Sequence, residues 1–368
     1  MSGLVHLPVV ASDPAIDDLI AANAPLSFSS SGGKDSDAAA LATSAYLDQK
    51  GHRGTRLVIH ADLGAVEWAT SLAQTQRLAD HLGLELLVVR RAAGGLLERW
   101  QARWDSSVAR YQQLRTVTLI MPWSAPNLRF CSSELKAGPI SAALARRFPG
   151  QTIMSVVGLR RAESAARARI PIWQPDPRLT RVRAGTRGVS WYPIADWTTR
   201  EVFDYHAALR FPMHEAYGRG ASRVSCVCCI LSSQADLRVA VGDPRNHPLY
   251  RELVALECQS GFAFQAQHWL GDLAPQLLDA NARERLAQAQ HIAQVRAKIE
   301  IRIPKHLKYT LGWPQVMPTV SEAELLAEVR QGVANVHGFP IEYATRDAIL
   351  ARYAELMQER PARAGGRE

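Results

Sequence analysis

The residues with the clearest chemical meaning form one serine- and glycine-rich run, Ser31-Gly32-Gly33-Lys34-Asp35-Ser36. The run follows an apolar stretch at 25–29 and precedes an Ala- and Leu-rich stretch at 37–49, so it joins an expected strand to an expected helix. Backbone amides, a helix N-terminus, hydroxyls and a cation then meet at one point, which suits phosphate oxygens. The spacing is that of neither a Walker loop nor a dinucleotide-binding turn. The alternative is a turn that only connects the two elements.

Each residue type in this loop has its own expected role. Ser29, Ser31 and Ser36 would donate hydrogen bonds to phosphate oxygens, and Lys34 would neutralise their charge. Gly32 and Gly33 would let the backbone approach the phosphate closely. Asp35 would hold Mg²⁺ or brace the loop.

A second candidate site follows the next apolar strand, at His60-Ala61-Asp62-Leu63-Gly64. A carboxylate at this position can reach the ribose or adenine of a nucleotide, and a glycine allows close approach. Asp62 and Gly64 are therefore expected to bind nucleotide. A turn role for Asp62 is the alternative.

The elements that must position these residues alternate along the chain. Apolar strands are expected at 25–29, 56–60, 84–89, 152–158 and 191–194, and helices at 14–24, 37–49, 67–82, 96–115, 140–147 and 199–209. The Pro-rich segment 170–177 is expected to be an extended loop or lid. The alternation predicts an α/β fold with a doubly wound, mostly parallel, Rossmann-like five-stranded sheet that binds ligand at the carboxyl ends of its strands.

The chain after the cysteine-rich stretch reads as helical, at 249–258, 273–289, 293–300 and again from Ser321. The predicted organisation is a helical lead-in at 1–24, a nucleotide-binding domain at 25–220, a cysteine-containing segment at 221–265, a helical extension at 266–359 and a disordered tail at 360–368.

The charge of the chain is unevenly spread. Its 43 Lys and Arg against 35 Asp and Glu leave a net charge of +8. Between 160 and 187, two acids, Glu163 and Asp176, stand beside eight arginines: Arg160, Arg161, Arg167, Arg169, Arg178, Arg181, Arg183 and Arg187. This run suits an anionic partner, either nucleotide phosphate and sulfate groups or a nucleic-acid backbone. A solvated basic surface is the alternative.

The chain has no run of 18 apolar residues, and acids interrupt its N-terminal region early. We therefore expect a cytoplasmic protein without a membrane partner.

Several ordered blocks resemble one known family. From Phe28 to about Phe264 the chain is similar to the phosphoadenosine-phosphosulfate reductase-like branch of the adenine-nucleotide alpha-hydrolase superfamily, whose pyrophosphate loop (PP-loop) has the pattern Ser-Gly-Gly-x-Asp-Ser. The blocks that carry the resemblance are 31–36, 60–67, 127–136, 157–164 with Arg167, and 222–229.

The resemblance implies a nucleotide pocket over the sheet, with basic side chains on the anionic end of the ligand. Arg129 and Lys136 would form one such pair and Arg160 with Arg167 another, since guanidinium forks bind phosphate or sulfate in a bidentate way. Glu163 would orient Arg160 or ligate a metal. Gly158 would contact the nucleotide. Lys34, Asp35, Arg160 and Cys131 form the expected catalytic set; a structural salt-bridge network is the alternative.

The five cysteines suggest a metal or redox site, because a disulfide framework is unusual in a reducing compartment. Cys226 and Cys229 form a Cys-x-x-Cys pair, and Cys131 lies in a block expected near the pocket. These three would hold a [4Fe-4S] cluster with one iron free to carry sulfide, as the resemblance to sulfur-inserting relatives implies. Alternatively, Cys228 or Cys258 would be a fourth ligand, for a cluster or, less favoured, a zinc ion. Buried, unligated cysteines are the alternative.

The leading functional hypothesis is an ATP- and Mg²⁺-dependent enzyme that adenylates its substrate, releases pyrophosphate and transfers sulfur, or otherwise modifies a nucleotide or nucleic acid. A cysteine desulfurase or thioredoxin would be its sulfur or electron donor, and it would function as a homodimer.

A second hypothesis is a reductase of phosphoadenosine phosphosulfate or adenylyl sulfate that releases sulfite. Such reductases carry a C-terminal Glu-Cys-Gly motif, whereas this chain has Glu257-Cys258-Gln259-Ser260-Gly261 and no later cysteine. A third is a non-catalytic nucleotide-binding subunit of a DNA-modification or defence complex.

Overall fold

The computed structural model describes residues 7–266 and 268–359. The chain divides into two compact units. The first joins the residues up to Leu97 with Ser124–Asn246, and the second joins Glu98–Trp123 with the chain from His247 onward. Residues 98–123 therefore pack with the C-terminal helices, although in the chain they lie within the expected domain at 25–220.

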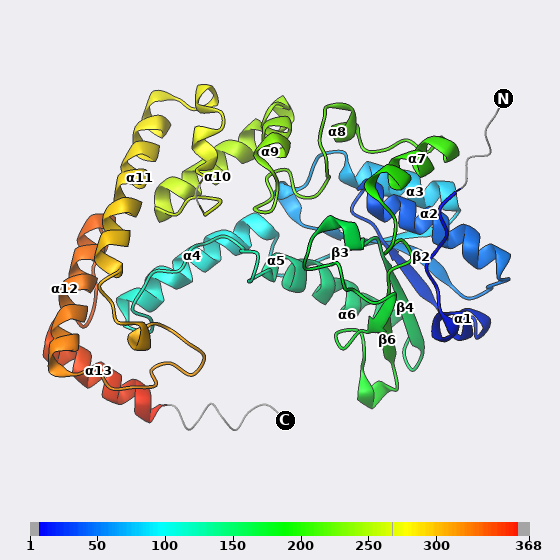
Figure 1. The fold of residues 1–368 in the computed structure, drawn as a ribbon. Coiled ribbons are helices and arrows are strands. Elements are labelled where there is room, and N and C mark those ends of the chain that lie inside the picture. Colours follow the sequence, from blue (N-terminus) through cyan, green and yellow to red (C-terminus); the bar gives the residue numbers. More distant parts are fainter. Residues whose placement is uncertain (1–6, 267, 360–368) are drawn as a thin grey trace. The chain divides into compact units, whose positions relative to one another are not determined.

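The first unit is built on a mixed sheet of six strands in the order β3-β2-β1-β4-β6-β5 (Figure 1). The strands are β1 (Leu26–Ser29), β2 (Arg56–Asp62), β3 (Glu85–Arg90), β4 (Thr152–Val157), β5 (Trp173–Pro175) and β6 (Arg187–Trp191). All neighbouring pairs are parallel except β5 with β6. The expected α/β fold with a mostly parallel sheet is confirmed.

The expected count of five strands was one too low. The sixth strand, β5, lies in the segment 170–177 that the sequence favoured as a loop. It pairs antiparallel with β6 at the edge of the sheet. Pro175 lacks an N–H to donate, which an edge strand tolerates because no further strand needs that hydrogen bond. The strand expected at 191–194 lies instead at Arg187–Trp191, and residues 192–194 are not part of a strand.

Five helices connect the strands or flank the sheet: α1 (Pro14–Ala21), α2 (Lys34–Gln49), α3 (Ser71–Leu82), α6 (Gly138–Arg147) and α7 (Thr199–Leu209). The shorter helical pieces of this unit are η1 (Gly64–Val66), α5 (Phe130–Ser132), η2 (Ser133–Ala137), η3 (Arg161–Glu163), η4 (Val182–Ala184), α8 (Glu215–Gly218), α9 (Gln234–Val241) and η5 (Pro244–Asn246). Capping residues fix two of the starts. Asp13 accepts from the amide of Ile16, and Thr198 forms a reciprocal capping box with Glu201.

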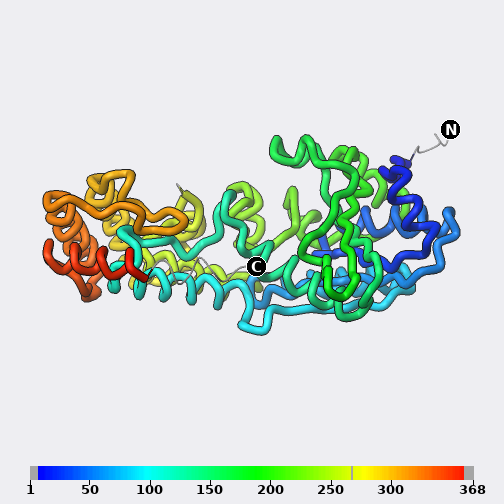
Figure 2. Tube along the Cα trace, turned by 90° about the horizontal axis from the view of Figure 1, so that it is seen from below, coloured from blue at the N-terminus to red at the C-terminus, as the bar shows by residue number. Residues whose placement is uncertain are grey.

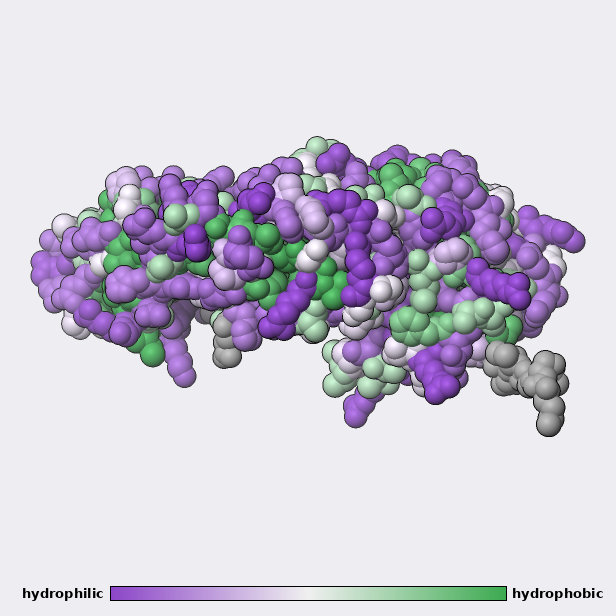
Figure 3. All heavy atoms as spheres, turned by 90° about the horizontal axis from the view of Figure 1, so that it is seen from above, coloured by the Kyte–Doolittle hydropathy of each residue, from purple (hydrophilic) through white to green (hydrophobic). Residues whose placement is uncertain are grey.

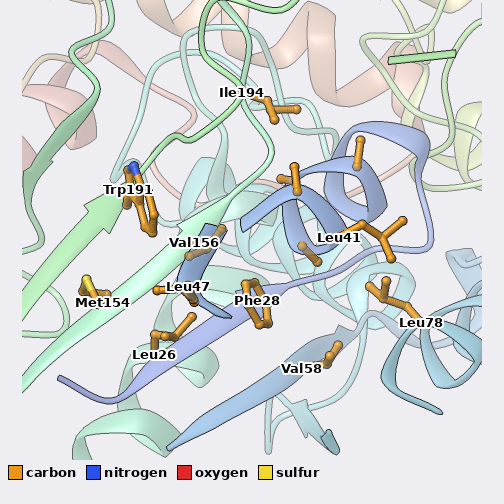
Figure 4. Packing of buried hydrophobic residues seen from close by; sticks show 14 of the residues in the cluster. Leu26, Phe28, Leu41, Leu47, Val58, Leu78, Met154, Val156, Trp191 and Ile194 are labelled. Carbon is orange, nitrogen blue, oxygen red and sulfur yellow. The ribbon is translucent and has the colours of Figure 1, made fainter. Parts of the chain in front are cut away.

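Alternating side chains of the strands build a core on each face of the sheet. Leu26, Phe28 and Val156 pack with Leu41 of α2 and Leu78 of α3 (Figure 4). On the opposite face a second cluster joins strand residues to α6 and to the segment before β6: Leu57, Ile59, Ile153, Leu144, Phe148 and Leu179. Burial on both faces explains why these strands read as continuous apolar runs.

The second unit is helical. Four of its helices pack in succession, α10 (His247–Ser260), α11 (Ala280–Glu300), α12 (Val320–His337) and α13 (Arg346–Gln358) (Figure 2). The inserted helix is α4 (Leu96–Gln112), and short turns lie at η6 (Leu270–Asp272), η7 (Pro275–Leu277) and η8 (Lys305–Leu307). The helices expected at 273–289 and 293–300 are one continuous helix, α11. Leu114 and Val117 are buried with Leu326 and Tyr353 in its core.

No helix in the described ranges has the length and apolar character needed to cross a membrane. The face shown in Figure 3 carries mostly hydrophilic side chains with smaller hydrophobic areas between them. The expected disordered tail at 360–368 lies outside the described residues.

Candidate functional site

A cleft of about 650 Å³ opens beside the serine- and glycine-rich loop, wholly within the first unit. We call it the loop cleft. It runs from the carboxyl ends of β1 and β4, past Ser155 and Ser190 on the sheet face, to the segment before β6. The loop contributes Ser29, Ser31, Gly33, Asp35 and Ser36 to its lining.

The loop is held open by its glycines and by internal hydrogen bonds. Gly32 has φ +71°, and a Cβ there would lie 2.9 Å from the carbonyl oxygen of Ser71. Ser36 Oγ donates to the carbonyl of Gly33 at 2.7 Å, which closes the turn just before α2 begins at Lys34. The N-terminal end of α2 therefore lies at the cleft, where its partial positive charge favours an anion.

A buried carboxylate supports the loop from below. Asp37 accepts from Gln74 Nε2 at 3.0 Å and from the hydroxyls of Ser30 and Ser36 at 3.3 and 3.4 Å. Burial raises its pKa to about 7, although these hydrogen bonds favour the charged form. Sequence analysis did not single out Asp37, because an acid in the first turn of a helix is common.

Lys34 points away from the cleft and is 3% exposed. Its ammonium donates to the carbonyl of Ser222 at 3.0 Å and pairs with Asp35 at 3.1 Å, and it lies over the ring of Tyr217. Lys34 and Gly32 are not among the residues that line the loop cleft. The ammonium would have to leave these partners to contact a phosphate directly.

Arg160 is also turned inward. Its Nε donates to Asp35 Oδ1 at 2.6 Å, its Nη1 donates to Thr199 Oγ1 at 3.2 Å, and its backbone amide donates to Glu163. Asp35 therefore lies between two buried cations, Lys34 and Arg160, and still lines the cleft. The bracing role expected as one option for Asp35 is the one its contacts favour.

Gly158 brings β4 against the loop. A Cβ at this position would lie 2.4 Å from the carbonyl oxygen of Asp35 and 2.8 Å from the amide nitrogen of Ser36. Gly158 lines the cleft, as expected, and no larger residue fits there without moving the start of α2.

The opposite wall of the cleft is basic. Arg129, Lys136 and Arg223 line it and form no ion pair with a carboxylate among the residues the structure describes. Arg167 lines it too, but pairs with Glu163, another lining residue. The structure thus brings Arg129, Lys136 and Arg167 together beside the loop, as the resemblance implied, and adds Arg223.

The acidic segment after β2 is arranged differently from the expectation. Asp62 accepts from the amide of Gly64 at 2.7 Å, which is the turn role weighed as the alternative, and neither residue lines the cleft. Glu67 lines it instead and accepts from His60 Nε2 at 3.0 Å. Burial opposes charge on His60, but the hydrogen bond and charge of Glu67 outweigh it and raise the His60 pKa.

The thiols of Cys131, Cys226 and Cys229 lie near one another at the edge of the cleft. Their chain neighbours Ser132 and Ser225 line it, although no cysteine does. Desolvation of its thiol raises the pKa of Cys226 to about 12; the charge of Lys136 opposes this rise, and the nearby thiols of Cys229 and Cys131 add to it. Cys228 is fully buried, and Cys258 lies on α10 in the second unit.

These thiols do not fit a cluster or zinc site as folded. In the part of the chain that the structure covers, no group of three or more His, Cys, Asp or Glu side chains is placed to hold a metal ion.

Other lining residues had no local motif to reveal them. Gln174, Asp176, Arg178 and Tyr192 reach the cleft from β5, β6 and the segment between these strands. Their position depends on the antiparallel edge pairing that sequence analysis missed. Arg223 lies in the block 222–229, in which only the cysteines were assigned a role from sequence.

Known proteins resemble this chain over part of its length. Residues 25–232 match the model of the phosphoadenosine phosphosulfate reductase domain. An uncharacterized 37.8 kDa protein in gpa 5'region of Escherichia phage 186 is 26% identical over 183 residues, which span 47% of each protein. A crystal structure of phosphoadenylyl-sulfate reductase from Candida auris in a phosphate complex matches with a TM-score of 0.35 and 12% identity, covering 60% of this chain and 98% of the other. Because the family model spans more than half of its length, the chain belongs to the phosphoadenosine phosphosulfate reductase domain family.

Proposed function

We propose that the chain is an enzyme that binds the phosphates of an adenine nucleotide in the loop cleft and uses the nucleotide in sulfur chemistry. One observation carries the proposal: the hydroxyls and helix start of the loop share a single cleft with three cations that have no carboxylate partner among the described residues, Arg129, Lys136 and Arg223. Hydroxyls, a helix N-terminus and unpaired cations are the groups that bind phosphate.

With ATP as ligand, an oxygen of the substrate would attack the α-phosphorus, and the bond from that phosphorus to the bridging oxygen would break. Pyrophosphate would leave, and the terminal sulfur of a persulfide on a donor protein would then attack the activated carbon and displace AMP. A second thiolate of the donor would attack the inner sulfur of the resulting S–S bond, which leaves the sulfur on the substrate and a disulfide on the donor. Ser31, Ser36 and the start of α2 would bind the pyrophosphate, and Arg129 and Lys136 would offset its charge. Mg²⁺ would neutralise part of the phosphate charge; Glu67 is a carboxylate that lines the cleft and suits this ion, whereas both oxygens of Asp35 are paired with Arg160 and Lys34.

The buried network would position these groups without touching the ligand. Arg160 and Lys34 hold Asp35 from two sides, and Asp37 holds the hydroxyls of Ser30 and Ser36. Preorganised groups of this kind need not rearrange during the reaction, which is why they lower its barrier.

The test is pyrophosphate release from ATP by the full chain, with ATP binding measured in parallel. Lys136→Ala should weaken ATP binding at least tenfold, whereas Lys50→Ala removes an equal charge at an exposed pair with Asp17 and should change nothing. Failure of the unmodified protein to bind ATP would overturn the proposal. Binding without pyrophosphate release under any condition would favour a non-catalytic nucleotide-binding subunit.

A second candidate reaction is reduction of a sulfonucleotide, favoured by the family match and by the thiols beside the cleft. One thiolate would attack the sulfonate sulfur and expel the nucleotide phosphate. A second thiolate would then attack the cysteine sulfur, release sulfite and form a disulfide that thioredoxin reduces. Sulfite release that survives serine at Cys131, Cys226 and Cys229 would exclude this reaction at these residues.

A further inference from the structure

The segment between β5 and β6 presents a run of arginines that the loop cleft does not account for. Arg178, Arg181, Arg183 and Arg187 are all exposed, and none forms an ion pair with a carboxylate in the described ranges. Residues 177–187 contain no acid. Only Arg178 lines the cleft, so three guanidinium groups continue the positive charge beyond it.

This segment is a firmly anchored structure. Asp176 accepts from the amides of Arg178 and Leu179 and from Ser190 Oγ, so the one nearby acid is engaged in the fold. The backbones of Arg181 and Thr186 pair in both directions, at 2.9 and 3.2 Å. The arginines are therefore displayed on an ordered surface, which lowers the entropic cost of binding.

Positive charge also lines the loop cleft itself, at Arg129, Lys136 and Arg223. A single nucleotide occupies the cleft and can satisfy only the cations that line it. A ligand that satisfies both ends must carry regularly spaced negative charges over a longer distance. A nucleic-acid backbone has this property, and arginine is well suited to phosphate recognition.

We propose that residues 178–187 bind the phosphodiester backbone of a nucleic acid whose reacting nucleotide enters the loop cleft. This inference rests on the proposed function and deepens it by naming the substrate class. The exposed arginines hold the strand through its phosphates, which positions it without reading its sequence. The same surface gives the chain a salt-dependent affinity for the strand, since each phosphate contact releases a counterion.

The test measures binding of a fluorescent 20-nucleotide single strand and its duplex by anisotropy between 50 and 200 mM KCl. In R183Q/R187Q, the negative slope of log affinity against log salt should decrease in magnitude by about 1.4 for the single strand or about 1.8 for the duplex, given about 0.7 or 0.9 per phosphate contact. The control R53Q/R200Q removes the same charge from exposed positions in the first unit and should keep the slope of the unmodified protein.

Mononucleotide binding separates this inference from the proposed function. R183Q/R187Q should bind ATP as the unmodified protein does, because neither arginine lines the cleft. Equal slopes in R183Q/R187Q and R53Q/R200Q, with ATP binding intact, would overturn the nucleic-acid inference alone. Equal competition by heparin and by the unlabelled strand, without any effect of added ATP on strand binding, would also overturn it, because it would indicate a general polyanion surface.

Discussion

Replacing Gly158 by alanine should damage the loop cleft from behind. The new Cβ would lie 2.4 Å from the carbonyl oxygen of Asp35, whereas ordinary contact begins at 3.4 Å, so β4 and the start of α2 must separate by about 1 Å. Overpacking of this kind costs about 1–3 kcal/mol. A shift of about 1 Å in a group that positions a ligand can cost about 100-fold in activity.

The assay combines urea unfolding with titration of ATP. We expect Gly158→Ala to lower the unfolding free energy by about 1–3 kcal/mol and to weaken ATP binding at temperatures where the variant is still folded. Gly218→Ala is the matched control, because a Cβ at Gly218 meets nothing within 4 Å. If Gly158→Ala unfolds and binds ATP as Gly218→Ala does, the close approach of β4 to the loop does not organise the site.

Three further predictions concern buried charges. Arg160→Met should lower the unfolding free energy by about 1–3 kcal/mol, because it removes the buried guanidinium that donates to Asp35 while Lys34 still pairs with that carboxylate, and an unchanged urea unfolding curve would contradict this. Lys136→Ala should slow alkylation of Cys226 at pH 8.5, because its charge opposes the burial that raises the thiol pKa, and an unchanged rate by mass spectrometry would count against it. Burial raises the Glu257 pKa from 4.5 to about 7, so its contribution to stability is full below pH 4.5. That contribution is lost as pH rises to 7, by up to about 3 kcal/mol of unfolding free energy. E257Q should remove this pH dependence from urea unfolding, and an unchanged pH profile would refute the assignment.

The parts of the fold that local pattern determines were predictable from sequence. The strand, loop and helix around Gly32 and Gly33 depend on neighbouring residues, and continuous apolar runs mark the strands buried on both faces. The start of α1 is equally local, since the Asp13 side chain accepts from the amide of Ile16 three residues later. The loop cleft at the carboxyl ends of β1 and β4 follows from the parallel order of the strands.

The orientation of single side chains was not predictable, because it depends on distant partners. Lys34 turns inward because its ammonium donates a hydrogen bond to the carbonyl of Ser222, 188 positions later. Glu67 reaches the cleft, and Asp62 does not, because the turn after β2 uses the Asp62 carboxylate for its own backbone. The strand β5 is too short for a periodic signal and exists only through its pairing with β6.

Residues 98–123 pack with the C-terminal helices, and this limits how the chain can be shortened. Tyr111, Leu114 and Val117 are fully buried, and Arg330 of α12 donates to the carbonyl of Tyr111 at 2.7 Å. A gene cut after Asn246 would keep these apolar residues while deleting the helices that cover them. The C-terminal helices therefore cannot be removed without exposing apolar side chains of 98–123 to solvent.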